Sequence, residues 1–403
     1  MRALRTASTR RLTVIVAAVA ALALMASIAQ GALTGAGPTP APKALANAVL
    51  DAFNAPEPDG LSATIHFTNK LLPSGSLPGG AASPLASGAD GRLWVRNNGD
   101  FRLELQSDGG DAQIVSDGST VTVYDASSNT VYRAQLPADT TDPAAPADHN
   151  EKLTLDKVQK ALDRLAKTWT LSGAEPTSTA GQPTYTVKIS PKDDGGLLGA
   201  AKVAWDAVRG APLRAAVYAQ GQSDPVLELK ATDVSYDAVP ASDVSVSPPK
   251  GAKVVDLSPK DVTRAARSHG RAAKRGAKAA KVQGPAAVQS ALDFTLSAPD
   301  RLAGLPRQEV RLVSVDGEQA ALVTYGQGFG AIGVLEHKAS AGKGKDKAGS
   351  LGANLPSINI DGGTGSELAT ALGTVVLFEH NGVEYIVAGS VPPAAAENAA
   401  RGL

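Results

Sequence analysis

The chain contains no cysteine. Disulfide bonds, thiolate metal sites, cysteine nucleophiles and a lipid-modified cysteine behind an export signal are therefore all excluded. Aromatic residues make up only 4% of the 403 residues, and the basic and acidic residues balance to a net charge of zero. A neutral chain has no overall field that would attract nucleic acid, so we expect no nucleic-acid partner.

Residue types that carry metal or catalytic chemistry are few and widely separated. No two of the histidines have the close spacing of a helical zinc pair; they are His66, His149, His269, His337 and His380. We therefore predict no metal site and no cofactor. The sequence also has no nucleophile elbow and no recognisable Ser/His/Asp arrangement. We predict no catalytic residues and a protein that is not an enzyme.

One glycine-rich stretch matches a known spacing. Residues 328–333 fit the pattern G-x-G-x-x-G of dinucleotide-binding loops. That motif requires a helix directly after the glycines, so that amide groups at the helix start meet the pyrophosphate. A strand is predicted to follow here, so we interpret the glycines as a tight or bulged connection between strands.

The amino terminus has the pattern of an export segment. Four arginines precede an uncharged run from Leu12 to Ala29, and small residues at 27–29 suit a cleavage site. Residues 1–31 are predicted to be either a cleaved signal peptide or a retained membrane anchor, because the run is slightly long for the first and slightly short for the second. Either way the rest lies outside the cytoplasmic membrane, in the cell envelope: a periplasm-like space or the outer face of that membrane.

Residues 44–246 are predicted to form one α+β domain. A helix over 44–53 is followed by a strand over 61–71, and a second helix over 153–167 turns its apolar residues Leu155, Val158, Leu162 and Leu165 inward. Turn residues separate a series of further short strands. These strands are predicted over 92–96, 101–106, 112–115, 119–124, 130–135, 184–189, 202–206, 212–219, 226–229 and 233–236.

Residues 247–285 are predicted to be a basic, flexible linker. Between Arg264 and Lys281 seven basic residues occur without an acidic one. This run is either a solvated spacer or a segment attracted to anionic lipid or cell-wall polymer.

A smaller α+β domain is predicted over 286–403. Its signals include a short helix over 286–294 and a hairpin of strands 308–315 and 318–325. A strand over 332–337 follows, and the capping-box spacing of Thr364 and Glu367 predicts a helix to Leu372. A hairpin of strands 374–380 and 383–388 is predicted around Asn381-Gly382, and a last helix begins near Pro393.

Apolar residues alternate with polar ones in several of the predicted strands. Phe101, Leu103 and Leu105 are separated by Arg102 and Glu104, and the same alternation occurs over 185–189 and 213–217. If the sheet curls, the apolar set lines its concave side. Two outcomes are open: a filled core, or a cavity for an apolar ligand.

The region GRLWVRNNGDFRLELQSDGGDAQIVSDGSTVTVYDASSNTVYRAQL resembles the signature region of the LolA-like lipoprotein-carrier superfamily. The residues that fit the order of the family pattern are Gly91, Trp94, Arg96, Phe101, Arg102, Ile114, Asp117, Gly118, Tyr124 and Asp125. The resemblance covers about residues 43–246. It implies a strongly curved antiparallel half-barrel closed by helices, with an apolar interior that accepts acyl chains.

One position departs from that family. Its turn Arg-Pro is Asn97-Asn98 here, with Arg96 one residue earlier. The candidates for a latch between barrel and lid are therefore Arg96 and Arg102.

The second domain is similar to that of the RseB/MucB envelope-stress regulators. The stretches VTYGQGFGAIGVLEH and YIVAGSVPPAAAENAARGL carry this likeness, and the Lys-rich insertion over 339–352 departs from it. Such regulators bind lipid-related signals and an anti-sigma factor.

Three functions follow as hypotheses. The first is an exported carrier or sensor that binds acyl chains of lipids or lipoproteins in the half-barrel. The second is a regulator whose small domain binds an anti-sigma factor or another envelope protein, and the third is a packed, ligand-free scaffold held at the membrane by its N-terminal helix. The candidate lipid-binding residues are Trp94, Phe101, Leu103, Leu105, Ile114, Val121, Val123, Val187, Ile189 and Val217.

Overall fold

The computed structural model describes residues 37–71, 84–108, 110–126, 129–135, 153–192, 196–245, 249–257, 282–315, 318–339, 355–361 and 363–403. The chain divides into two units. The first comprises Met1–Lys70, Ala82–Lys192 and Gly199–Pro259, and the second comprises Leu71–Ala81, Asp193–Leu198 and Lys260–Leu403. The predicted export segment and the basic run 264–281 lie outside the described residues. No helix in the described part is long and apolar enough to cross a membrane.

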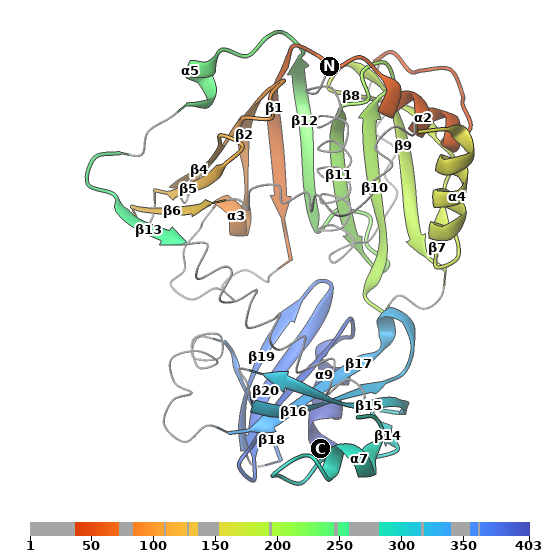
Figure 1. Cartoon of the computed structure of the whole chain (residues 1–403), viewed down its shortest axis with the longest axis vertical. Helices are drawn as coiled ribbons and strands as arrows, with labels where there is room; N and C mark the ends of the chain where they lie inside the picture. The colour runs from red at the N-terminus through yellow and green to blue at the C-terminus, as the bar shows by residue number, and fades with distance from the viewer. Residues whose placement is uncertain are drawn as a thin grey trace, which may run out of the picture. The chain divides into compact units, whose positions relative to one another are not determined.

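The first unit is built on one curled sheet (Figure 1). Its described strands follow the order β13-β6-β5-β4-β3-β2-β1-β12-β11-β10-β9-β7, and β8 also pairs with β9. The strands are β1 (Gly60–Asn69), β2 (Gly88–Arg96), β3 (Phe101–Ser107), β4 (Gly110–Ser116), β5 (Thr120–Asp125), β6 (Thr130–Gln135), β7 (Trp169–Leu171), β8 (Glu175–Thr179), β9 (Gln182–Pro191), β10 (Leu198–Asp206), β11 (Pro212–Ala219), β12 (Leu227–Ser235) and β13 (Lys253–Leu257). The predicted curved antiparallel half-barrel with helices is thereby confirmed.

The pairing register decides which side chains share a face. Leu103 of β3 pairs with Leu93 of β2 and with Ile114 of β4, and Ile114 pairs in turn with Val123 of β5. Because residues directly opposite each other in antiparallel strands point the same way, these side chains form one continuous side of the sheet. We call this side the apolar face and the side that carries Arg102 the polar face.

Helices α2 (Leu45–Asn54) and α4 (Leu155–Leu165) pack together at the β9 end of the sheet (Figure 1). Apolar residues of α2, with Ala48 at the centre, form a core cluster with Tyr185, Val187 and Trp205. Val158 of α4 is buried, whereas Leu155 and Leu165 are 45% and 37% exposed. The prediction that all four apolar residues of the second helix face inward is therefore wrong for these two, because only the middle of this short helix is covered.

Two short helices complete the first unit. They are α3 (Pro84–Ser87), which contacts β1 to β4, and α5 (Ala241–Val244), which contacts β2 and β3.

The strands predicted over 226–229 and 233–236 form the single strand β12. Its pairing with β1 shifts register between Thr64 and Ile65, so a bulge rather than a turn interrupts the alternation. Residues 253–257, within the stretch predicted as linker, form β13.

The second unit contains a sheet with the order β14-β15-β16-β17-β21-β20-β19-β18 among its described strands. These strands are β14 (Arg301–Leu302), β15 (Leu305–Val315), β16 (Glu318–Tyr325), β17 (Ile332–Lys338), β18 (Ser357–Ile360), β19 (Gly363–Thr370), β20 (Gly373–His380) and β21 (Val383–Gly389). Helices α7 (Pro285–Gln289) and α9 (Pro393–Arg401) contact β15 and β20–β21. Val288 of α7 and Ala396 of α9 belong to one buried cluster with Val323 and Val387 of the sheet.

The glycine-rich stretch 328–333 is a 3₁₀ turn, Gly328–Gly330, followed by β17. This arrangement agrees with its interpretation as a connection between strands. The last helix also begins as predicted, with a proline in its first turn.

The helix predicted from Thr364 to Leu372 is wrong. Residues 364–370 belong to strand β19, which pairs with β18 on one side and β20 on the other, and residues 371–372 form the turn to β20. The capping-box spacing of Thr364 and Glu367 is therefore accidental. Gly365 lies so close to β20 that an added Cβ would be 3.0 Å from the carbonyl oxygen of Leu377. Pairing on both edges outweighs a weak local signal for helix.

Three two-residue turns between described strands have both central residues in the left-handed region, among them Ala303-Gly304 between β14 and β15, with φ of 46° and 80°. Asn381 and Gly382, at the predicted hairpin, have φ of 50° and 74°, and Ala180 and Gly181, between β8 and β9, have φ of 51° and 71°. Positive φ at both central residues is the type I′ pattern that matches strand twist.

We predict that Gly181→Ala destabilises the first unit by about 1 kcal/mol, the cost of placing a Cβ in the left-handed region. The matched control is Gly173→Ala. No atom lies within 4 Å of an added Cβ at either position, but only Gly181 has a positive φ. Denaturant unfolding followed by tryptophan fluorescence measures the difference, since all three tryptophans, Trp94, Trp169 and Trp205, lie in this unit. Equal effects of the two substitutions would contradict the backbone explanation.

Candidate functional site

The apolar face of the first sheet gathers side chains from many strands. Phe101, Leu103, Leu105, Ile114, Val121 and Val123 follow one another through the β3–β4–β5 register. On the other side of β1, Phe67 pairs with Leu229 of β12, and Leu227 pairs with Val217 of β11. The register thus continues the same face from β5 to β11.

Strands β9 and β10 join this face through their odd-numbered residues. The Lys202 ammonium lies 5.9 Å from the centre of the Tyr218 ring, and the Tyr218 hydroxyl accepts a hydrogen bond from Arg214 at 2.7 Å. These three side chains are on the polar face, because Arg214 alternates with Ala215, the partner of Leu229. Val203, next to Lys202, and its partner Val187 therefore point to the apolar face.

Burial differs along the apolar face. Val217 is fully buried, Leu105 is 2% exposed and Val187 is 8% exposed. The other predicted lining residues on this face are half-buried: Phe101, Leu103, Ile114, Val121, Val123 and Ile189. Two further residues of the face remain more open, Tyr132 at 40% and Leu229 at 39% exposure. The alternation within β6 and β12 could have pointed to them.

Trp94 is a correction to the predicted lining. It pairs with Arg102 of β3, and the Arg102 guanidinium lies 5.0 Å from the centre of its ring. Its neighbours Leu93 and Val95 occupy the apolar face instead. The register therefore turns the indole to the polar face, away from the other nine candidates, because alternation allows only every second residue of a strand to face one side.

The polar face carries a pocket of about 730 Å³ next to α5. The side chains around it are mostly charged or polar: Thr64, Asp90, Arg92, Trp94, Arg102, Glu104, Gln106 and Asp243, with Gly91. Glu104 pairs with Arg102 and accepts a second hydrogen bond from Gln113 at 2.9 Å. His66 Nδ1 lies 2.7 Å from an oxygen of Asp90.

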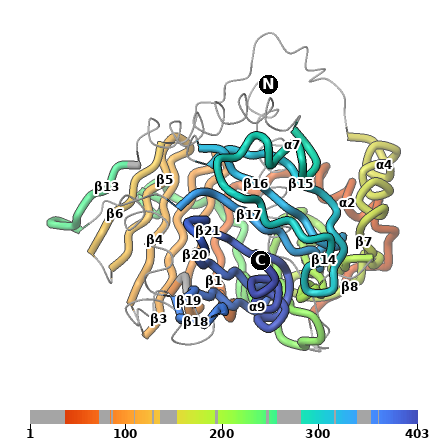
Figure 2. The backbone as a smooth tube through the Cα atoms, turned by 90° about the horizontal axis from the view of Figure 1, so that it is seen from below, coloured from red at the N-terminus to blue at the C-terminus, as the bar shows by residue number. Residues whose placement is uncertain are grey.

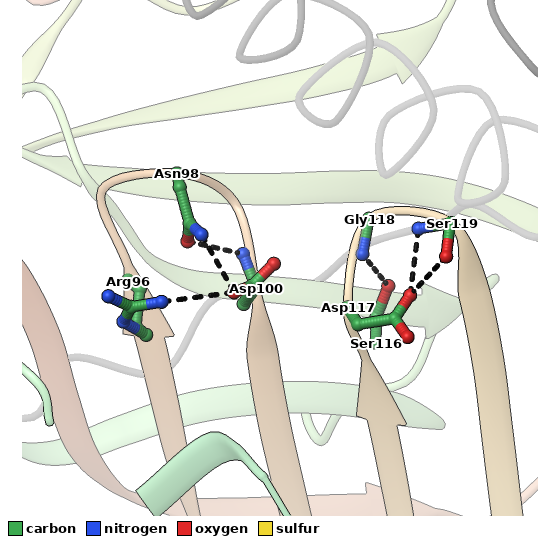
Figure 3. A network of polar contacts seen from close by, with 7 residues as sticks. All are labelled: Arg96, Asn98, Asp100, Ser116, Asp117, Gly118 and Ser119. Atoms are coloured by element: carbon green, nitrogen blue, oxygen red, sulfur yellow. Dashed lines mark hydrogen bonds and ion pairs between the residues drawn. The ribbon is translucent and has the colours of Figure 1, made fainter. Parts of the chain in front are cut away.

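The two latch candidates take different places. Arg102 donates a hydrogen bond of 3.2 Å to the carbonyl oxygen of Asp243 and so ties β3 to α5. Arg96 instead forms an ion pair of 3.1 Å with Asp100 inside the β2–β3 turn (Figure 3). Asn98 also bonds Asp100 there, at 2.7 Å. Arg96 therefore holds a turn, and only Arg102 connects the sheet to a helix.

Among its described residues, the second unit has one carboxyl side chain that is fully buried. Glu336 of β17 is fully buried in the core sheet, between Ala321 of β16 and Tyr385 of β21. Its Oε2 accepts a hydrogen bond from the backbone N–H of Ser297 at 2.9 Å, and its Oε1 has no partner among the described residues. Desolvation raises the pKa of Glu336 to about 7. The Tyr385 pKa is raised to about 12, through burial and the nearby Glu336 charge.

Among the described residues no group of three or more His, Cys, Asp or Glu side chains is placed to hold a metal ion. His66 and His337 each lie beside one acidic residue only, Asp90 and Glu384.

Comparisons with known proteins concern the fold and one stretch of sequence. A family model described as "Predicted periplasmic protein (DUF2092)" matches residues 81–155. A search of the curated proteins found no match to this chain. Among solved structures, the chain is similar to MucB of Pseudomonas aeruginosa in a MucA/MucB complex, with 14% identity and a TM-score of 0.38, over 88% of this chain and 95% of that one.

A LolA superfamily protein of Nitrosomonas europaea is also similar, with 10% identity and a TM-score of 0.21, over 51% of this chain and 98% of that one. Members of both groups that the sequence resembles are thus found among the similar structures, and the resemblance is confirmed. At these identities the likenesses carry no statement about ligand or partner.

We predict that the stability of the second unit falls as pH rises from about 4.5 through 7. The pKa of Glu336 is raised in the folded state, so folding retains a proton that the unfolded chain loses over this range. The full effect is of the order of 3 kcal/mol. Glu336→Gln should remove it and make the second unit more stable than the wild type at pH 8.

The measurement is calorimetric unfolding between pH 4.5 and 8, with hydrogen exchange of β17 amides to assign the transition. The control is Glu318→Gln, an exposed residue of the same sheet, which should keep the wild-type pH dependence. A pH dependence that survives in Glu336→Gln would show that another group causes it.

Proposed function

We propose that this is an exported cell-envelope protein that binds acyl chains of lipids or lipoproteins on the apolar face of its half-barrel. The observation that carries the proposal is the half-buried apolar surface over β3 to β6. It lies toward the other end of the sheet from α2, whose core contacts are with β9 and β10. Phe101, Ile114, Val123 and Tyr132 supply this surface from four neighbouring strands.

The chemistry of this surface suits a hydrocarbon chain rather than a polar ligand. Val121 and Val123 of β5 and Ile114 of β4 present only apolar atoms. Each methylene that leaves water contributes about 0.8 kcal/mol. Ten buried methylenes therefore contribute about 8 kcal/mol, from which the costs of association are subtracted. Binding of this strength is reversible, as sequestration and release require.

Export is supported by two independent features. The arginines before the uncharged run Leu12–Ala29 have the order of an export segment. The family model that matches residues 81–155 is described as a predicted periplasmic protein. No bond is made or broken in the proposed activity, since the protein acts by binding. The alternative role, binding of an anti-sigma factor or another envelope protein through the second unit, stays a prediction.

We predict that the protein purified from an expressing cell carries lipid and that Val123→Glu lowers the bound lipid at least tenfold. A carboxylate on the apolar face would have to be desolvated by the acyl chain, which costs several kcal/mol. The matched control is Thr122→Glu, one residue earlier in β5 and on the polar face, where it pairs with Val115 and Arg133. This variant should keep its lipid.

Native mass spectrometry of residues 32–403, followed by lipid extraction, measures the bound material. Tryptophan fluorescence checks that both variants remain folded. A wild-type protein that is free of lipid and takes up none from added vesicles would contradict the proposal. So would equal binding by the two variants.

A further inference from the structure

Strand β13 closes one edge of the large sheet in an unusual way. It pairs in parallel with β6, from Lys253 opposite Thr130 to Leu257 opposite Ala134. The neighbouring pairs β5–β6, β4–β5 and β3–β4 are all antiparallel. Figure 2 shows β13 at one end of the sheet, with α4 at the other. A parallel partner cannot come from a tight hairpin, so this edge is filled by a segment that is remote in sequence.

One backbone hydrogen bond fixes which residues of β13 bind β6. Lys253 N–H donates to the carbonyl oxygen of Asn129 at 2.9 Å. In a parallel ladder every second residue uses both backbone groups toward the same neighbour. The N–H of Val255 therefore points to β6, and the N–H of Val254 points away from the sheet.

The side chains of Val254 and Asp256 attach β13 only lightly, whereas that of Val255 is half-buried. Val254 is 48% exposed, and the ion pair of Arg133 with Asp256 spans 3.7 Å with side chains 43% and 67% exposed. Exposed ion pairs of this kind contribute at most about 1 kcal/mol. Parallel pairing is also slightly weaker per residue than antiparallel pairing. By contrast, the β6 residue Val131 is fully buried and its strand is firmly part of the sheet.

We propose that the β6 edge is a binding site for an extended segment of a partner polypeptide, and that β13 is the chain's own exchangeable occupant of it. Addition of a strand to a sheet edge is a general mode of peptide recognition. The occupant that the chain places there indicates the chemistry of the partner segment. It runs parallel to β6, has an apolar residue beside Val131 and has an acidic residue beside Arg133.

This site adjoins the proposed acyl-chain surface, because Val255 of β13 pairs with Tyr132, but it uses different groups. It is built from backbone groups at the edge of β6, whereas acyl chains would contact side chains on the apolar face. Because β13 is covalently attached, its effective concentration at the edge is of the order of millimolar. A partner segment must bind the β6 edge tightly enough to displace β13 at that effective concentration. β13 therefore sets the minimum affinity that a partner segment needs.

The test uses the full chain and a labelled peptide with the sequence of residues 252–259, AKVVDLSP. Val255→Pro removes an N–H that β13 donates to β6, and Val254→Pro is the matched control, because its N–H points away. We expect the peptide to bind Val255→Pro at least tenfold more tightly than wild type in fluorescence polarisation. Val254→Pro should bind it like wild type.

Hydrogen exchange keeps the test independent of affinity. The amides of Val131 and Arg133, which donate to β13 in this register, should exchange faster in Val255→Pro and slow down again when peptide is added. Tryptophan fluorescence reports whether the first unit stays folded. A folded Val255→Pro variant with exposed Val131 and Arg133 amides that binds no peptide at 1 mM (about the effective concentration of the tethered strand) would overturn the proposal.

A charge exchange tests the predicted acidic position. The peptide with Asp256→Lys should bind the Val255→Pro variant at least threefold more weakly, and adding Arg133→Glu to that variant should restore the loss. If the wild-type and Asp256→Lys peptides bind equally to both proteins, the charge opposite Arg133 does not affect peptide affinity. The proposed acidic position in the partner segment is then wrong.

Discussion

The pairing register of the large sheet is the constraint on which the first unit depends. Side chains alternate with a period of two, so a slip of one residue in β3 would exchange Leu103 with Arg102 on the apolar face. Polar turns at the strand ends oppose such slips (Figure 3). In the β4–β5 turn, one oxygen of Asp117 accepts from the N–H groups of Ser119 and Thr120 at 2.9 Å and 2.7 Å. The Ser119 hydroxyl, which donates to the same oxygen at 2.8 Å, and then these two N–H groups lower the pKa of Asp117.

A curled sheet that does not close into a barrel leaves two surfaces that need a partner. One is the apolar face, against which α2 packs near β9 and β10. The other is the edge of β6, which would expose a row of backbone donors and acceptors without β13. Both features follow from the same open architecture. The proposed acyl-chain surface and the proposed strand site are therefore two uses of one incomplete barrel.

A buried carboxyl group lowers the free energy of unfolding of the second unit when the group is ionised. Glu336 sits among apolar residues and retains a single backbone donor, from Ser297. Replacement of a buried ionisable group by an apolar one is often neutral or stabilising. The placement of Glu336 therefore makes the stability of this unit depend on pH between about 4.5 and 7.

The sequence by itself determined most of the longer strands, both helices of the first unit that are longer than four residues, the turn at Asn381-Gly382, and the alternation that places nine of the ten candidate residues on one side of the sheet. These are local properties, because alternation, turn residues and amphipathic helices act within a few neighbours. Even so, the prediction placed Trp94 of β2 in the lining, whereas its pairing with Arg102 puts it on the polar face.

Only the tertiary structure decided the remaining features. Strand β19 exists because β18 and β20 pair with it, against the helix signal at Thr364 and Glu367. Strand β12 runs through a bulge that a sequence pattern reads as a break, and β13 joins β6 across more than a hundred residues. Contacts between segments so far apart leave no local pattern, since each segment forms its structure only against the surface that another segment provides.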